Sequence, residues 1–352
     1  MHVPDGFINA PVSAVAGVVA AGAVAVSLRG ARRELDERTA PLAGLVAAFI
    51  FAVQMLNFPV AAGTSGHLLG GALAAILVGP FTGVLCIAVV LLMQGILFAD
   101  GGLTALGVNI TVMGVVTVVV AYALFRGLIR VLPHGRRSTT AAAFVAALVS
   151  VPAAAVAFTL IYAVGGTTDV PIGKVLTAMV GVHVLIGIGE AAITALTVGA
   201  VIAVRPDLVH GARGLAAPLK LRVGGELVDA PAAPAATPAP VAARSTRTVW
   251  ATGLVAALVL AGFVSFYASA NPDGLEKVAA DKGIDEKVQE HGAADSPLAD
   301  YGVKDVGNAR VSGGLAGVIG VGVTVAVGSG VFWAVRKRRT PQTPASRTAE
   351  SV

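Results

Sequence analysis

Residues 175–204 read VLTAMVGVHVLIGIGEAAITALTVGAVIAV, an apolar stretch in which His183 and Glu190 are the only ionisable side chains. Because a membrane-crossing helix needs about 20 predominantly apolar residues, this stretch predicts one. Eight further segments have the same character, although the one over 67–80 is short and rich in glycine. We expect that segment to form either a tilted short helix or a re-entrant helix buried in protein. The predicted membrane segments lie near residues 11–28, 42–60, 67–80, 81–98, 103–125, 141–164, 175–204, 248–268 and 312–335.

The composition supports this interpretation, because the 352 residues are 56% hydrophobic and only 13% charged. Soluble domains carry about twice that charged fraction, so the chain is predicted to be an integral membrane protein. We predict an all-α fold, in which a seven-segment helical bundle is followed by a C-terminal two-helix hairpin. The single cysteine, Cys86, excludes a disulfide or a thiolate metal cluster within one chain. No positive region precedes the first apolar segment, so we do not expect a cleaved signal peptide.

The basic residues predict how the segments face the membrane. If the amino terminus lies outside, most of the 25 Lys and Arg residues fall on inner loops, on a linker and on the tail. Cytoplasmic loops carry such an excess, so we expect an outer amino terminus and a cytoplasmic carboxyl terminus in a bacterial cell membrane. This topology also accounts for the net charge of +5, and no nucleic-acid partner is expected.

The chain divides into three parts by composition. Residues 1–210 contain the seven-segment bundle, and residues 211–247 are rich in Pro and Ala, which is typical of a semi-rigid cytoplasmic linker. Residues 248–340 contain two apolar segments joined by a charged and polar outer loop over 269–311. A long linker before a separate hairpin indicates two proteins fused into one.

The amino terminus has the composition of a metal chelator. The chain begins MHVPDGF, and His67 lies within GTSGHLLGG at residues 63–71. The amine of Met1 and the amide nitrogen of His2 close a five-membered ring around a metal ion. The amide nitrogen and the imidazole Nδ1 of His2 close a six-membered ring. An imidazole nitrogen of His67, on the same outer side, would complete the square of nitrogen ligands that Ni(II) and Cu(II) prefer.

A few other polar residues lie in or beside the apolar segments, and such residues are functional candidates by default. His183 and Glu190 are seven residues apart and so share a helix face, where they either lock helix packing or serve metal passage or proton exchange. Asn57 and Asn109 lie near the outer loops and are candidates to orient His67 or the amino-terminal strand. Asp100 opens an outer loop as a helix cap, or accepts the second ring N–H of a metal-binding histidine.

Two classes of activity are excluded by what the sequence does not contain. No stretch matches the phosphate-binding pattern Gly-x4-Gly-Lys-Ser/Thr, so the chain is not its own ATPase and needs either a partner or an ion gradient. No Gly-x-Ser-x-Gly or His-Glu-x-x-His pattern and no pair of intramembrane Asp is present, so an intramembrane enzyme is not expected.

Four motifs resemble the CbiM/NikM family, whose members are the substrate-capture components of energy-coupling factor ABC transporters for cobalt or nickel. The motifs are MHVPDGF (1–7), GTSGHL (63–68), LFADGGLTALG (97–107) and HVLIGIGE (183–190). The sequence NPDGLE (271–276) resembles the motif of the accessory partner NikN or CbiN, known as the PDGLE domain. The chain therefore resembles a fusion of the two proteins.

The resemblance implies a site, partners and a cargo. Met1 would supply its amine, His2 its amide and imidazole nitrogens, and His67 its imidazole to one divalent ion. The implied partners are a transmembrane coupling protein like CbiQ or NikQ and a cytoplasmic ATPase like CbiO or NikO. No cofactor is expected besides the transported Ni(II) or Co(II).

The choice of metal rests on small differences within the family. Cobalt-type members, which feed cobalamin biosynthesis, more often begin Met-Glu-Gly and carry Ser-Cys-Ser-His, whereas residues 4–6 and 64–67 of this chain are more nickel-like. Planar nitrogen donors also favour Ni(II), so we expect nickel ahead of cobalt. The alternative function is a proton-coupled secondary metal transporter that uses His183 and Glu190.

Overall fold

The computed structural model of the protein describes residues 1–37, 39–61, 63–133, 135–213, 220–223, 226–229 and 246–338. Its principal elements are, in chain order, α1 (Ala10–Glu34), α2 (Thr39–Gln54), β1 (Phe58–Pro59), β2 (Ser65–Gly66), α3 (Gly71–Val78), α4 (Pro80–Leu97), α5 (Leu106–Asn109), the π-helix η1 (Ile110–Val116), α6 (Thr117–Val131), α7 (Arg136–Gly165), α8 (Ile172–Val204), β3 (Lys220–Val223), β4 (Glu226–Asp229), α9 (Thr246–Gly262), α10 (Gly274–Lys282) and α11 (Ala309–Lys337). The short 3-10 helices are η2 (Pro206–Leu208), η3 (His210–Ala212), η4 (Val264–Tyr267), η5 (Asp285–Lys287) and η6 (Ala299–Tyr301).

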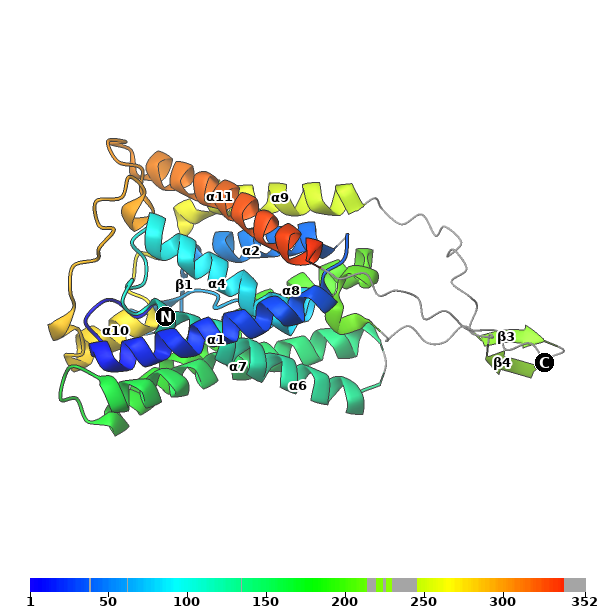
Figure 1. The fold of residues 1–352 in the computed structure, drawn as a ribbon, viewed down its shortest axis with the longest axis horizontal. Helices are drawn as coiled ribbons and strands as arrows, with labels where there is room; N and C mark the ends of the chain where they lie inside the picture. The colour runs from blue at the N-terminus through cyan, green and yellow to red at the C-terminus, as the bar shows by residue number, and fades with distance from the viewer. Residues whose placement is uncertain are drawn as a thin grey trace.

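Seven helices of the described chain are long and apolar enough to cross a membrane. They are α1, α4, α7, α8, α11, the continuous run from α5 through η1 to α6, and α9 with η4. Figure 1 shows them running lengthwise beside one another. The predicted all-α, multi-pass membrane protein is confirmed.

Two of the predicted segments form shorter helices than expected. The segment 42–60 is helical only as far as Gln54, and the chain then forms the β1–β2 pair. In the segment 67–80, only the 8 residues of α3 are helical, a length of about 12 Å at 1.5 Å per residue. Since a hydrocarbon core is about 30 Å thick, α3 does not cross it. Every residue of α3 is buried, which is where such a broken segment is tolerated.

Buried polar side chains satisfy the main chain just before α3. The carboxylate of Glu190 on α8 accepts the N–H groups of Leu69, at 2.6 Å, and Gly70, at 3.1 Å. Gln54 at the end of α2 donates its Nε2 to the carbonyl oxygen of Leu69 at 3.0 Å. An unpaired main-chain group at this depth costs several kcal/mol, so these side chains stabilise the non-helical approach to α3.

A sharp turn and another buried carboxylate then start α4. Gly79 has a φ of 101°, a conformation that glycine adopts without strain. A Cβ at this position would lie 2.5 Å from the carboxyl carbon of Glu34. Glu34 accepts N–H groups of Phe81 at 3.2 Å and Thr82 at 2.7 Å, the free donors of the α4 amino terminus.

The C-terminal hairpin of α9 and α11 packs against α2. A Cβ on Gly44 of α2 would lie 2.3 Å from Oγ of Ser329, and a Cβ on Gly320 of α11 would lie 2.2 Å from the ring of Phe51. Small residues at these positions allow the helix backbones to approach closely, as in other membrane helix pairs. The hairpin therefore forms one body with the bundle.

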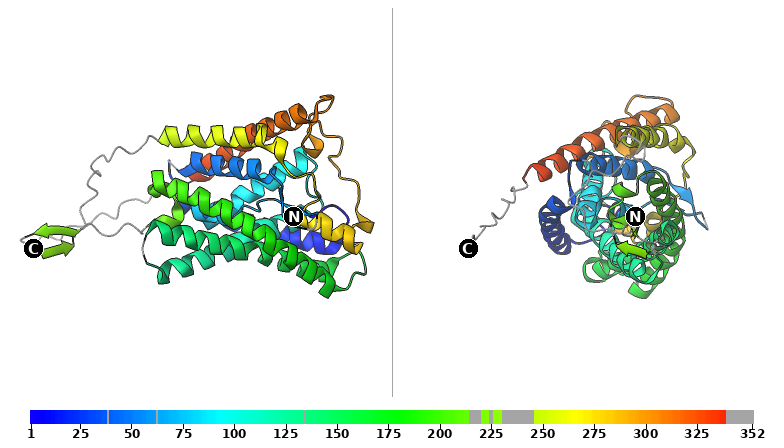
Figure 2. Two further views of the ribbon diagram at one scale, coloured as in Figure 1. Left: turned by 180° about the vertical axis from the view of Figure 1, so that it is seen from behind. Right: turned by 90° about the vertical axis from the view of Figure 1, so that its right-hand side faces the viewer.

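The loop between α9 and α11 carries α10 and covers one end of the bundle. Figure 1 shows α10 and the amino terminus at that same end, and Figure 2 shows the arrangement from behind. The main-chain N–H of Ser269 donates to the carbonyl oxygen of Asn57 at 2.7 Å, and that of Asp300 donates to Phe98 at 2.9 Å. The loop between α9 and α11 is thus bonded to the loops at this end of the bundle.

Most of the predicted linker over 211–247 lies outside the described residues, namely 214–219, 224–225 and 230–245. Within it, β3 and β4 form an antiparallel pair that the sequence analysis did not predict, with Arg222 opposite Leu227.

Candidate metal centre

The amino-terminal strand is held inside the protein by hydrogen bonds to Asn109 of α5 and to the loop just before α5. Asn109 accepts the N–H of Val3 at 2.8 Å and donates its Nδ2 to the Val3 carbonyl oxygen at 3.1 Å. The carboxylate of Asp5 accepts the N–H groups of Leu103 at 3.2 Å and Thr104 at 2.8 Å. Asn109 is thus bonded to both main-chain groups of Val3.

Because of these bonds, Met1 is only 2% exposed, and its amine lies against His67. The Nδ1 of His67 is 3.0 Å from the carbonyl oxygen of Leu68, which only accepts hydrogen bonds. Nδ1 therefore carries the proton, and Nε2 presents its lone pair to the Met1 amine. A histidine with this tautomer, fixed by a carbonyl on its other nitrogen, is the usual form of an imidazole metal ligand.

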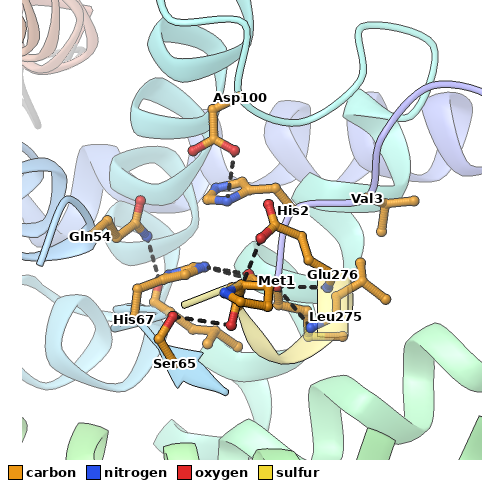
Figure 3. A network of polar contacts seen from close by, with 12 residues as sticks. Met1, His2, Val3, Gln54, Ser65, His67, Asp100, Leu275 and Glu276 are labelled. Atoms are coloured by element: carbon orange, nitrogen blue, oxygen red, sulfur yellow. Dashed lines mark hydrogen bonds and ion pairs between the residues drawn. The ribbon is translucent and has the colours of Figure 1, made fainter. Parts of the chain in front are cut away.

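His2 lies beside Met1 and His67, but its two ring nitrogens face other side chains. Its ring stacks on that of His67, with 5.0 Å between the centroids and 15° between the planes. Its Nδ1 is 3.2 Å from Oδ1 of Asp100, and its Nε2 is 3.2 Å from Oε1 of Gln94. Figure 3 shows Met1, His2 and His67 gathered together, with Asp100 beside the His2 ring. The structure thus brings the predicted ligand residues together, while the Nδ1 of His2 contacts Asp100.

The burial of His2 predicts a pH-dependent stability of the metal-free protein. Burial lowers the pKa of His2 from 6.5 to about 4, so the folded state holds it neutral while the unfolded state protonates below pH 6.5. Because the unfolded state then binds more protons, stability is present above pH 6.5 and is lost as the pH falls towards 4. We expect unfolding to become easier by about 2 kcal/mol between pH 8 and pH 5.

Thermal unfolding in detergent with a chelator, measured at pH 8, 6.5 and 5, tests this expectation. The control is His2→Gln, which does not titrate and should reduce the pH dependence over this range. A parent protein and a His2→Gln variant with equal pH dependence would contradict the assignment.

A carboxylate that the sequence did not indicate as a candidate also lies against Met1 and His67. Oδ2 of Asp273 lies 2.5 Å from the Met1 amine and 3.2 Å from Nε2 of His67. Burial alone would raise the pKa of Asp273, but the positive charge of the amino terminus beside it holds it well below its usual value. The sequence signal for this residue is the pattern Asp-x-x-Glu within NPDGLE, which marks a helix N-cap in the loop between α9 and α11.

The remaining candidates lie around this centre in different ways. Asp100 accepts the hydroxyl of Tyr301 at 2.6 Å through Oδ2 as well as facing His2. Asn57 lines the adjoining cavity, and its main-chain oxygen accepts the N–H of Ser269. His183 donates Nδ1–H to the carbonyl oxygen of Met179 at 2.7 Å, one turn back on α8.

A cavity of about 610 Å³ adjoins the centre and is lined in part by His2, His67, Asp100, Asp273 and Tyr301. Across the residues that the structure describes, no group of three or more His, Cys, Asp or Glu side chains is arranged to hold a metal ion. The class defined by fold and site is a multi-pass membrane protein that presents nitrogen donors to a cavity at one end of its bundle.

Comparison with known proteins identifies the family. Residues 2–208 match the model of the CbiM family, described as the cobalt uptake substrate-specific transmembrane region, and residues 247–337 match the PDGLE domain. The chain belongs to the CbiM family, and it carries a PDGLE domain as well. It is a component of a cobalt or nickel transport system rather than an enzyme.

Similar proteins agree with this assignment. A putative metal transport protein of Haloquadratum walsbyi is 41% identical over 59% of this chain and 93% of its own length. A putative fused nickel transport protein, NikMN, of Archaeoglobus fulgidus is 39% identical over 60% of this chain and 68% of its own length. A crystal structure described as a truncated transition metal transporter has a TM-score of 0.52 and 26% identity, and covers 58% of this chain and 99% of that one.

Proposed function

We propose that this chain captures Ni(II), in preference to Co(II), as the substrate-specific component of an energy-coupling factor transporter. The ligands are the Met1 amine, the amide nitrogen and Nδ1 of His2, and Nε2 of His67. The observation that carries the proposal is the burial of the Met1 amine against the Nε2 lone pair of His67. Binding in this form requires the His2 imidazole to exchange its contact with Asp100 for the ion.

The proposal divides the chain into the predicted parts and gives them an orientation. Residues 1–210 capture the ion on the outer side, residues 211–247 link the parts in the cytoplasm, and residues 248–340 form the PDGLE hairpin with outer loop 269–311. The family descriptions that match residues 2–208 and 247–337 support this division. The excess of Lys and Arg on the inner segments supports the outer amino terminus.

Energy comes from partners in this proposal, namely a transmembrane coupling protein and a cytoplasmic ATPase. A proton relay through His183 and Glu190 has less support, because both carboxylate oxygens of Glu190 accept main-chain N–H groups before α3. The Nδ1–H of His183 is likewise hydrogen-bonded to the carbonyl oxygen of Met179. These contacts favour a structural role for Glu190.

The preference for nickel is tested by competition. The purified protein, with Met1 as its first residue, is exposed to equal concentrations of Ni(II) and Co(II), and its metal content is measured by mass spectrometry. We expect about one equivalent of metal with nickel in excess, because planar nitrogen donors suit Ni(II). An excess of cobalt would overturn the preference, and no bound metal at all would overturn the capture function.

A further inference from the structure

The PDGLE segment is bonded directly to the loop that presents the imidazole ligand of the proposed site. The N–H of Ser65 donates to the carbonyl oxygen of Pro272 at 2.9 Å, and its hydroxyl donates to that of Asn271 at 2.7 Å. A Cβ on Gly274 would lie 2.7 Å from the side chain of Ile186 on α8. Glycine at this position therefore lets the segment reach the bundle beside the ligand loop.

This docking holds one oxygen of Asp273 against the nitrogen ligands. Oδ1 of Asp273 accepts the N–H groups of Leu275 at 2.8 Å and Glu276 at 3.0 Å, which caps α10. The carboxylate is thus fixed by its own helix, and Oδ2 is left to face Met1 and His67. Asp273 is only 7% exposed, so this oxygen has little access to solvent.

The charge of this buried carboxylate needs a partner when metal binds. In the metal-free structure the partner is the Met1 ammonium group. Metal ligands must be deprotonated, so the amine loses its proton and its positive charge when it coordinates the ion, and the amide nitrogen of His2 loses its proton and becomes an anion. Both protons leave to the solvent. A buried carboxylate left unpaired is strongly destabilising. The two positive charges of the incoming ion balance the amide anion and the carboxylate, provided that the carboxylate stays beside the ion.

The distances also fit a shared ion. Nitrogen and oxygen ligands with bonds of about 2.0–2.1 Å lie about 3 Å apart when they are neighbours around one ion. The Met1 amine, Nε2 of His67 and Oδ2 of Asp273 are all within 3.2 Å of one another. No rearrangement of the carboxylate is needed to bring it within reach of an ion held by the two nitrogens.

We propose that Asp273 of the PDGLE hairpin binds the captured ion directly, as an oxygen ligand in addition to the four nitrogens. This inference rests on the proposed capture function and assigns a chemical role to the fused hairpin. The site then spans both parts of the chain, and coordination is five-fold.

The test is Asp273→Asn, since asparagine caps a helix about as well as aspartate and so preserves the docked segment. We expect the dissociation constant for Ni(II) to rise about tenfold or more, as it does on loss of supporting groups at other metal sites. Asp281→Asn, on the same helix but paired with Lys277, is the charge-matched control and should bind like the parent. Asp273→Ser, which also keeps a capping oxygen, serves if the asparagine variant does not fold.

The nickel X-ray absorption edge reports the coordination number of the bound ion, which would not change if Asp273 had only a structural role. The parent should show five-coordinate nickel with an oxygen neighbour, and Asp273→Asn should show the pre-edge feature of planar four-coordinate nickel. Unchanged affinity with an unchanged spectrum, or tighter binding in the variant, would overturn the inference alone. If the parent binds no nickel, the proposed function fails as well.

Discussion

Adding residues ahead of Met1 should abolish high-affinity metal binding. In the proposed site the free amine is itself a ligand and closes the five-membered chelate ring with the amide nitrogen of His2. An extension converts this amine into an amide, which no longer pairs with Asp273 as a cation. The added residues would also need space beside Met1, which is buried and only 2% exposed. We expect affinity for Ni(II) to fall by more than roughly 100-fold, since losing outer-shell groups alone costs 10- to 100-fold.

The measurement is Ni(II) titration of the extended protein beside one that carries the same residues after Val352. The C-terminal extension should leave binding unchanged. Thermal unfolding without metal tells whether the extended chain still folds. If the extension carries a protease site that leaves Met1 as the first residue, cleavage should restore binding. Full affinity in the uncleaved protein would rule out the amine as a ligand.

The membrane helices were predictable because apolar length is a local property of the sequence. Segments 141–164 and 175–204 are each long and apolar enough to predict a membrane helix without reference to the rest of the chain. The helices α7 and α8 cover these two segments. The short length of α3 depends instead on Glu34 and Glu190, which stabilise the chain on either side from other helices. Helical periodicity places Glu190 on the same face as His183, but it does not tell which main-chain groups that face meets.

The candidate site was partly predictable for a similar reason. The pair His2 and His67 follows from chelate chemistry and from the expected topology, and the structure brings the two rings together. Asp273 was missed because it is 206 residues from His67 and belongs to a hairpin whose docking is a tertiary feature. The pattern Asp-x-x-Glu is typical of a helix N-cap, which is a local role, and only one of the two Asp273 oxygens is used for it.

Replacing His67 with alanine should remove metal binding while leaving the bundle folded. His67 provides the one ligand of the proposed nitrogen set that comes from outside the first two residues. Without it, Met1 and His2 offer three nitrogens on a strand that Asn109 still holds in place. We expect a loss of more than roughly 100-fold in affinity for Ni(II), larger than for an outer-shell group.

The His67→Ala substitution should also lower the stability of the metal-free protein. The ring of His67 donates to the carbonyl oxygen of Leu68 and stacks on His2, so its removal opens a cavity beside Met1. We expect destabilisation of about 1–3 kcal/mol, which is typical of the loss of one buried hydrogen bond with its packing. A melting temperature within several degrees of the parent would therefore accompany a complete loss of nickel.

The matched control is His210→Ala, in η3 beyond the far end of α8. It removes an imidazole that lies 6.1 Å from the ring of Tyr122, measured between centroids, and away from the amino terminus. This variant should retain one equivalent of nickel. If both variants lose the metal, the loss reflects the fold rather than the ligand. If His67→Ala keeps one equivalent at parent affinity, the imidazole is not a ligand, and the buried contact between Met1 and His67 serves packing alone.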